Sequence, residues 1–273
     1  MKKIFKGFVT LALCATLGVA ATSFASCGDP NTITIGASPT PHAEILKEAV
    51  AEELKKDGYK LKVVEYLDYV QPNNALEAGD LDANYFQHNI YLKDFNETHN
   101  THLTAVANVH YEAFGIYRGK YTEGELSDIP DKSKVLVPND GTNEARALFL
   151  LQAANLITLK EGVTYSKATK NDIESNPKNL QIMEIESAQI PISLSDAAIG
   201  VVNGNYALQH NLSAAIQYEN IPETEQEQYV NVVAVKSGNE ESEKTKALKK
   251  AILSDAVKTY VQQKYNGSVI CVF

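Results

Sequence analysis

The end of a strand, a glycine-containing turn and the start of a helix are expected in succession over residues 138–146, Pro-Asn-Asp-Gly-Thr-Asn-Glu-Ala-Arg. The first N–H groups of a helix lack partners within the helix and carry a partial positive charge, so a helix start can bind a carboxylate. Arg146 lies in the expected first turn and could add a bidentate pair to that anion. The pattern would also fit an ordinary N-cap at Thr142 or Asn143, with Arg146 in solvent.

Aromatic residues are concentrated in a second stretch, residues 84–91, and Tyr69 precedes it by one expected helix. Such rings suit an apolar or thioether side chain, because a sulfur–ring contact contributes about 0.3–1.5 kcal/mol. Core packing explains any single ring as well or better, and the histidine could bond either a ligand or a core acceptor. The candidates for a ligand pocket are Tyr69, Phe86, His88 and Tyr91.

Asn203 and Asn231 each interrupt a strongly apolar segment. A buried asparagine needs hydrogen-bond partners. These side chains could bond backbone, or they could offer their amides to the amine and carboxylate of a zwitterion. The pattern leaves both possibilities open.

No pattern in the chain indicates catalysis. The sequence contains no Gly-x-Ser-x-Gly, no P-loop and no dinucleotide-binding fingerprint. His99 and His102 have a spacing that metal sites use, but their polar neighbours indicate an exposed helix end. We therefore expect no enzymatic activity, no cofactor and no metal. A metal-capturing lipoprotein, a two-lobed enzyme acting on amino acids and a surface adhesin are the alternatives.

Residues 1–26 are typical of an export signal, in which Lys2, Lys3 and Lys6 precede an uncharged stretch over residues 8–21. The tetrapeptide Phe-Ala-Ser-Cys at 24–27 resembles a bacterial lipobox, so we expect a lipid on Cys27 and a short tether over residues 27–31. The alternative is cleavage after Ala25, which would leave Cys27 free to pair with Cys271.

The exported body is acidic. Removal of three lysines from 25 basic residues leaves 22 against 34 acidic residues, a formal charge of −12. Such a surface repels nucleic acids and anionic lipid headgroups, so we expect no nucleic-acid partner. After the signal, no segment approaches the roughly 20 apolar residues of a membrane span. The sequence therefore predicts an extracytoplasmic protein held at a bacterial membrane by its lipid.

Strands and helices alternate along this body. Strands are expected at 32–36 and 61–64, with a helix from Ala43 between them and another helix at 69–78. A second alternation begins near Tyr117, with further strands at 135–138, 180–185, 198–202 and 229–235, and two closing helices follow. This alternation of strands and helices predicts an α/β fold with two lobes of mostly parallel sheet, and a ligand cleft at the carboxyl ends of the strands. We assign 32–115 and 229–273 to lobe 1, and 116–228 to lobe 2.

Several of these segments together resemble the methionine-binding lipoprotein family, of the MetQ or NlpA type, along almost the whole exported length. The matching segments begin Ile-Gly-Ala-Ser at 35, Asp-Tyr-Val at 68, Gly-Asp at 79, Val-Pro-Asn-Asp at 137, Asn-Pro-Lys-Asn-Leu at 176, Val-Asn-Gly-Asn-Tyr-Ala at 202 and Tyr-Val-Asn at 229. The resemblance implies a two-lobed binding protein that closes on L-methionine, D-methionine or a methionine-containing dipeptide. It also implies a monomer that delivers its ligand to an ABC permease and ATPase.

The resemblance also implies roles for individual residues. The aromatic candidates would line the side-chain pocket, Arg146 would clamp the ligand carboxylate beside Asn143, and the amides of Asn203 and Asn231 would hold the amino and carboxylate groups. The chain departs from the family pattern at Phe114, Gly141, Ile192 and the C-terminal segment that contains Cys271.

Overall fold

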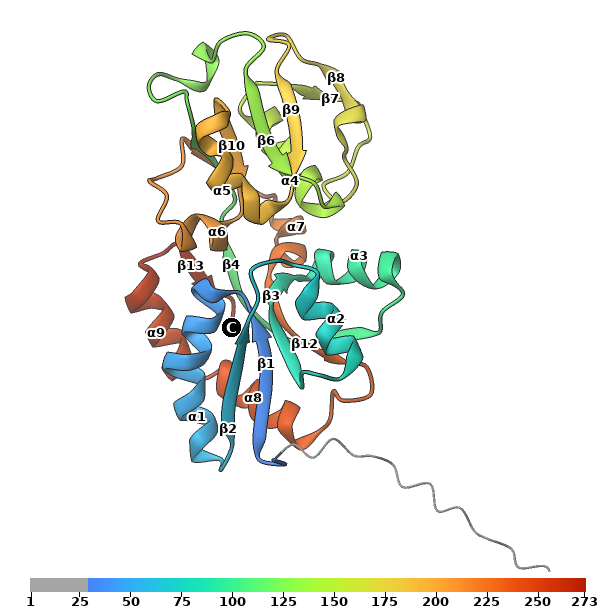
Figure 1. Ribbon diagram of the computed structural model, residues 1–273, viewed down its shortest axis with the longest axis vertical. Coiled ribbons are helices and arrows are strands. Elements are labelled where there is room, and N and C mark those ends of the chain that lie inside the picture. The colour runs from blue at the N-terminus through green and yellow to red at the C-terminus, as the bar shows by residue number, and fades with distance from the viewer. Residues whose placement is uncertain (1–28) are drawn as a thin grey trace, which may run out of the picture.

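The computed structural model describes residues 29–273, which form two α/β lobes, one above the other in Figure 1. The lower lobe contains a sheet with strand order β13-β4-β12-β3-β1-β2, and the upper lobe contains one with order β11-β5-β10-β6-β9. The expected export signal and lipid-bearing Cys27 lie outside the described residues, as does one partner of the alternative disulfide to Cys271. Within residues 29–273, no helix has the length and apolar character needed to cross a bilayer.

The first sheet is mixed rather than mostly parallel. Its strands are β1 (Thr32–Ala37), β2 (Lys60–Glu65), β3 (Ala83–His88), β4 (Leu103–Glu112), β12 (Asn231–Lys236) and β13 (Val269–Cys271). β1 pairs in parallel with β2 and β3, whereas β12 lies antiparallel between β3 and β4. β12 runs in this direction because the chain re-enters the lobe at the carboxyl ends of the other strands.

Helices cover both faces of the first sheet. They are the π-helical turns η1 (Pro39–Ala43) and η2 (Leu46–Val50), and α1 (Ala51–Lys56), α2 (Gln71–Ala78), α3 (Asn89–His99), α8 (Glu243–Ile252) and α9 (Asp255–Tyr265). Leu54, Leu248 and Val257 bury α1, α8 and α9 in one core, while Leu76 and Leu92 belong to a separate core formed with α2 and α3. The helix expected from Ala43 is therefore present, and its start is π-helical.

The expected second helix begins two residues later than the sequence suggested. The carboxylate of Asp68 accepts hydrogen bonds from the N–H groups of Val70 and Gln71 over 2.8 Å, which fixes the turn that precedes α2. Gly79 ends the helix in the left-handed region at φ 84°, a conformation that glycine adopts without a steric penalty.

The upper lobe is also a mixed sheet between two helical layers. Its elements are β5 (Gly115–Arg118), β6 (Lys134–Pro138), α4 (Gly141–Ala153), the hairpin of β7 (Thr158–Leu159) and β8 (Ile173–Ser175), β9 (Gln181–Ile185), α5 (Ile190–Ser193), β10 (Ile199–Val202), α6 (Gly204–Gln209) and β11 (Gln217–Tyr218). Leu148 and Leu151 of α4 belong to one core, and Ile190 and Tyr206 belong to another. Short 3₁₀ turns lie at Leu126–Asp128, Lys170–Asp172, Ser187–Gln189 and Leu194–Asp196.

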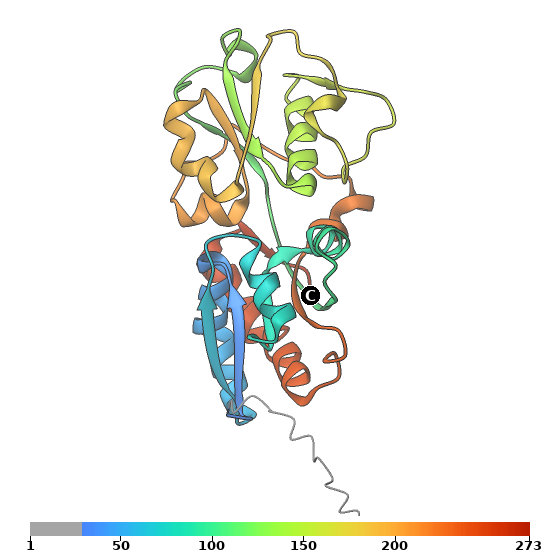
Figure 2. The same ribbon diagram turned by 45° about the vertical axis from the view of Figure 1, so that its right-hand side comes forward.

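Two chain segments connect the lobes. Residues 113–114 lead from β4 to β5, and residues 219–230 return to β12 through α7 (Glu223–Gln226) and the 3₁₀ turn η7 (Glu227–Tyr229). The view in Figure 2 shows both segments in the waist between the lobes. The predicted two-lobed α/β fold is confirmed, although β5, β12 and β13 run against their neighbours.

Candidate functional site

A pocket lies between the lobes, where the carboxyl ends of strands from both sheets meet. All the ligand-binding candidates from the sequence line it, and Gln87, Glu112, Gly204 and Asn205 complete its wall. About 350 Å³ of space, part of it continuous with the solvent, lies within and at the mouth of the pocket. Strand ends of a doubly wound sheet are the usual place for a ligand. The full lining set is Tyr69, Phe86, Gln87, His88, Tyr91, Glu112, Asn143, Arg146, Asn203, Gly204, Asn205 and Asn231.

Hydrogen bonds cross the pocket from one lobe to the other. The Tyr69 hydroxyl donates to Asn205 Oδ1 over 2.6 Å, and the Tyr206 hydroxyl donates to the Leu67 carbonyl over 3.1 Å. Tyr69 also stacks on Tyr206, with ring centroids 5.0 Å apart. The structure is therefore the closed arrangement of the two lobes.

Aromatic rings form the part of the pocket wall that comes from the first lobe. Tyr69 lies 5.8 Å from both Phe86 and Tyr91 between ring centroids, and Phe86 lies 6.2 Å from Tyr91. Phe86, near the end of β3, and Tyr91, in the first turn of α3, are buried because they pack on each other and on Phe95. These contacts give an apolar surface with polarisable ring faces, which suits a thioether or aliphatic side chain.

His88 links this wall to the second lobe. Its Nδ1 accepts from the N–H of Tyr91 at 3.1 Å, so the neutral ring carries its proton on Nε2, which donates to Asn143 Oδ1 at 3.2 Å. Burial, together with the charge of Arg146, lowers the pKa of His88 to about 3. The imidazole is therefore an uncharged group that sets the position of Asn143.

The start of α4 differs from both sequence-based interpretations. Its N-cap is Asp140 rather than Thr142 or Asn143, and the Asp140 carboxylate accepts from the N–H of Asn143 at 3.0 Å. The side chain of Asn143 also donates to Asp140, at 2.9 Å. The anion at this helix start is thus one of the chain's own carboxylates, and the helix terminus is not left open for a ligand.

Arg146 is 5% exposed and meets the pocket with only part of its guanidinium. Its Nε donates to Glu219 Oε2 at 2.7 Å, and its Nη2 donates to the other Glu219 oxygen and to the Glu112 carbonyl. The guanidinium carbon lies 4.6 Å from the Tyr229 ring centroid and 4.9 Å from that of Phe114. Among the described residues Nη1 has no hydrogen-bond acceptor, so that group is left for a ligand.

Buried amide atoms without partners point to a polar ligand. Asn203 donates from Nδ2 to Asn143 Oδ1 at 3.0 Å, yet its own Oδ1 is buried without a partner among the described residues. The same is true of Nδ2 of Asn205. Because a buried polar atom without a partner is costly, these two atoms mark where a ligand would donate and accept. Asn231 bonds His42 through its Oδ1 at 3.0 Å.

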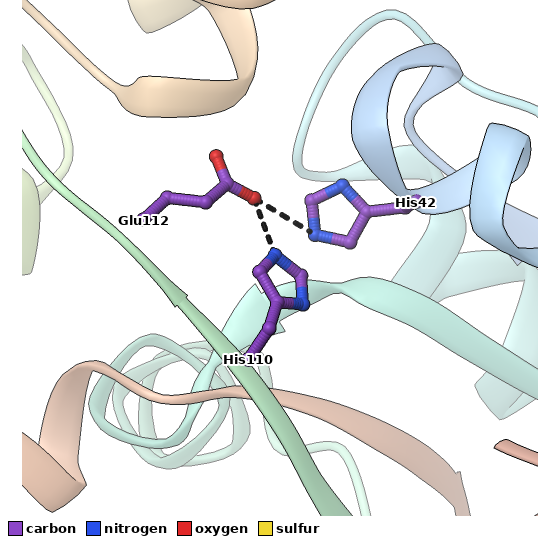
Figure 3. Close-up of side chains that lie close together, drawn as sticks. All are labelled: His42, His110 and Glu112. Atoms are coloured by element: carbon purple, nitrogen blue, oxygen red, sulfur yellow. Dashed lines mark hydrogen bonds and ion pairs between the residues drawn. The ribbon is translucent and has the colours of Figure 1, made fainter. Parts of the chain in front are cut away.

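A buried cluster of His42, His110 and Glu112, which no sequence pattern predicts, adjoins the pocket (Figure 3). Glu112 Oε1 lies 2.6 Å from His110 Nε2 and 3.6 Å from His42 Nε2. These atoms could be metal ligands by type. The 2.6 Å contact is a hydrogen bond, since two ligands on one zinc ion with bonds of about 2.0–2.1 Å lie farther apart. As arranged, the cluster is a hydrogen-bonded network.

Burial perturbs the titration of this cluster. It lowers the pKa of His42 to about 4 and that of His110 to about 3, so both rings are neutral. Burial raises the pKa of Glu112 to about 7, against the opposing effects of His42 and Arg146. Only the motif Pro-His at 41–42 and the end of β4 could have suggested these residues, because they are distant along the chain.

The remaining sequence observations fall outside the pocket. His99 is exposed and stacks on Phe95 with a centroid distance of 4.0 Å, and His102 is also exposed. Phe114 is fully buried, and Ile192 is 60% exposed on α5. A side chain at Gly141 would meet no atom within 4 Å, so the glycine at this position is not required by packing.

The model of the NlpA lipoprotein family matches residues 33–273. The methionine-binding lipoprotein MetQ of Bacillus subtilis is 36% identical over 275 residues, covering 100% of this chain and 99% of that protein. The D-methionine-binding lipoprotein MetQ of Escherichia coli K12 is 37% identical, covering 96% of this chain and 97% of its own. A nutrient-binding protein from Burkholderia cenocepacia, solved bound to methionine, superposes with a TM-score of 0.82 at 38% identity, covering 88% of this chain and 100% of that one.

Proposed function

The chain belongs to the NlpA lipoprotein family, and from that premise we propose that it is the substrate-binding lipoprotein of an ABC importer for methionine or a close analogue. It is a binding protein and not an enzyme. The two lobes close around the ligand without any bond being made or broken. The relatives and the methionine-bound neighbour support this assignment through their near-complete coverage of the chain.

One observation carries the proposal: a single pocket combines an aromatic wall with buried amide atoms that lack partners among the described residues. Tyr69, Phe86 and Tyr91 would surround the thioether side chain. Nη1 of Arg146 would bond the ligand carboxylate. The amides of Asn203 and Asn231 would hold the polar end of the zwitterion, with Asn143 and His88 keeping them in position.

Closure provides the signal for transport. A ligand shifts an open–closed equilibrium only by its difference in affinity for the two states. The contacts that cross the pocket, such as Tyr69 to Asn205, exist only when the lobes meet. A ligand that fills the pocket adds contacts to both walls and so favours the closed form, which the permease would recognise.

We further propose that residues 32–115 with 229–273 act as one lobe and 116–228 as the other, moving about the two connecting segments. Cys27 would carry the lipid that holds the monomer at the outer side of a bacterial membrane, and a permease with its ATPase would receive the ligand. Whether the ligand is L-methionine, its D-isomer or a methionine dipeptide is a matter for measurement.

The test is isothermal titration of the exported body, residues 28–273, after unfolding and refolding to remove any ligand that co-purifies. We expect saturable 1:1 binding of L-methionine with a Kd of about 1 μM or lower, corresponding to about −8 kcal/mol. D-methionine, a methionine dipeptide and leucine serve as comparators. If none of the sulfur-containing ligands bound, the proposal would be wrong.

A further inference from the structure

Glu112 is an ionisable residue of the pocket wall and does not belong to the hydrophobic core. It is the last residue of β4, its side chain is 5% exposed, and it lies in the pocket wall. One carboxylate oxygen, Oε1, faces His42 and His110, whereas Oε2 points away from both rings in Figure 3. Among the described residues Oε2 accepts no hydrogen bond.

The charges of the pocket form a complementary pair. Arg146 is its cation, held charged by Glu219 despite burial, which keeps its pKa above the usual value. His88 is neutral, for the reasons given above. Glu112 is the one acidic side chain among the described residues that line the pocket, and it is an anion when ionised. A buried cation site and a buried anion site in one pocket match the two ends of an amino-acid zwitterion.

We propose that Glu112 Oε2 accepts the α-ammonium group of the ligand, so that the site selects amino acids and peptides whose amine is free. This inference rests on the proposed function and extends it to a residue that defines the ligand class. His110 acts as a positioning residue, because its Nε2 donates to Oε1 over 2.6 Å and leaves Oε2 free for the ligand. His42 Nε2 donates to Asn231 instead and packs 3.6 Å from Oε1.

The contact with Gly204 supports this placement independently. A β-carbon at Gly204 would lie 2.7 Å from Glu112 Cβ and 2.9 Å from Oε2, closer than packed atoms approach. The backbone of lobe 2 therefore packs directly on the Glu112 side chain, beside the pairing of Val202 with Gly115, and a glycine is needed for that approach. The carboxylate is consequently enclosed in the closed form, where water does not compete for an ammonium ligand.

The experiment compares Glu112→Gln with the wild-type body by titration with three ligands. The ligands are L-methionine, N-acetyl-L-methionine and 4-(methylthio)butanoic acid, which lacks the amine. We expect wild type to prefer L-methionine over both analogues by at least thirty-fold. Glu112→Gln should lose at least ten-fold affinity for L-methionine and bind the amine-free analogue within three-fold of wild type.

Glu144→Gln is the matched control. Glu144 is another buried carboxylate whose pKa is raised to about 7, but it bonds the N–H of Lys170 and does not line the pocket. It should bind all three ligands as wild type does. If Glu112→Gln fails to fold, Glu112→Asp, which retains the charge on a shorter chain, is tested for the same loss of preference for a free amine.

The outcomes separate the two proposals. Failure of wild type to bind L-methionine overturns the proposed function. Wild-type binding of L-methionine, combined with undiminished binding by Glu112→Gln or equal affinity for the N-acetyl ligand, overturns the ammonium assignment and leaves the transport function intact.

Discussion

Arg146 and Glu219 form a buried ion pair in which Nε donates to Oε2 over 2.7 Å, although 73 residues separate them in the chain. Glu219 also accepts from the N–H of Phe114 at 2.8 Å and from the Tyr111 hydroxyl at 2.6 Å. The pair therefore ties helix α4 to both segments that connect the lobes. It holds the guanidinium in the pocket wall through Nε and Nη2.

Loss of the Glu219 charge should destabilise the protein strongly. Glu219→Gln leaves the buried guanidinium without a counter-ion, and removal of one partner of a buried pair costs about 3–5 kcal/mol. Urea unfolding followed by circular dichroism measures the free energy of unfolding. Glu223→Gln, on the exposed surface of α7, is the control and should change it by less than about 0.5 kcal/mol. A similar small change for Glu219→Gln would show that the pair contributes little.

Loss of the guanidinium should weaken ligand binding. Arg146→Ala removes the group with a free Nη1 in the pocket, and we expect the affinity for L-methionine to fall at least ten-fold, or about 1.4 kcal/mol. Titration is done at a temperature where the variant is shown to be folded. An unchanged affinity would exclude Arg146 as the partner of the ligand carboxylate.

Local patterns in the sequence were enough to predict the elements of the fold. The strands expected at 32–36, 61–64 and 135–138 occur as β1, β2 and β6, within one residue at each end. The alternating spacing of strands and the helical spacing of apolar residues depend on neighbouring residues alone. Strands and helices can therefore be predicted without knowledge of the tertiary structure. Helix boundaries are less certain, which is why the cap of α4 was assigned to Thr142 or Asn143 and is Asp140.

Pairings between distant segments could not be predicted in this way. No local pattern predicts that Glu219 meets Arg146, or that Glu112 meets His42, since each contact joins segments that are 70 or more residues apart in the chain. The antiparallel insertion of β12 between β3 and β4 follows from the crossing of the chain between the lobes. The pocket lining is more predictable, because His88 ends β3 and Asn203 lies between β10 and α6, positions that follow from the order of elements.

A methyl group at Gly204 should prevent closure. The added carbon of Gly204→Ala would lie within 3.0 Å of Glu112 and of the Ala113 carbonyl, both of which belong to the opposing wall. We expect at least a ten-fold loss of methionine affinity with little change in the unfolding transition, because the open form relieves the clash. Small-angle scattering with and without ligand measures compaction. Gly141→Ala is the control, because the added β-carbon would meet no atom within 4 Å. Gly58→Ala is not suitable, because Gly58 has a positive φ that an alanine would strain.

The affinity for methionine should rise between pH 6 and pH 8. Burial raises the pKa of Glu112 to about 7 against the effects of His42 and Arg146, so the free protein carries a partly protonated carboxyl. Only the ionised form accepts an ammonium group, and its fraction rises about ten-fold between pH 6 and pH 8 for a pKa of 7. His42 and His110, which face the same carboxylate, are neutral across this range. Titration at three pH values measures the dependence. A flat profile in wild type, matching that of Glu112→Gln, would contradict the assignment.

Acid should destabilise the fold through its buried histidines. The pKa values of His42, His88 and His110 are lowered from 6.5 to about 4, 3 and 3, so the unfolded chain binds protons below pH 6.5 that the folded chain does not. Glu112 and Glu144 act in the opposite sense between pH 7 and 4.5, because their raised pKa values keep two protons on the folded state. Three protons taken up by the histidines of the unfolded chain minus these two leave a net uptake on unfolding of about one proton between pH 6.5 and 4.5. The free energy of unfolding should then fall by about 1.4 kcal/mol per pH unit.

Urea unfolding at pH 7, 6 and 5 measures this slope, and His88→Gln should reduce it to near zero because one proton-binding site is removed. His210→Gln is the control, since His210 is exposed and should leave the slope unchanged. His88 caps α3 and bonds Asn143, so the variant is first compared with wild type at pH 7, where its loss of stability reflects those bonds alone. Equal slopes for wild type and His88→Gln would mean that His88 is protonated in the folded state. Its neutral Nδ1 could not then accept from Tyr91, and the arrangement of the aromatic wall would need another explanation.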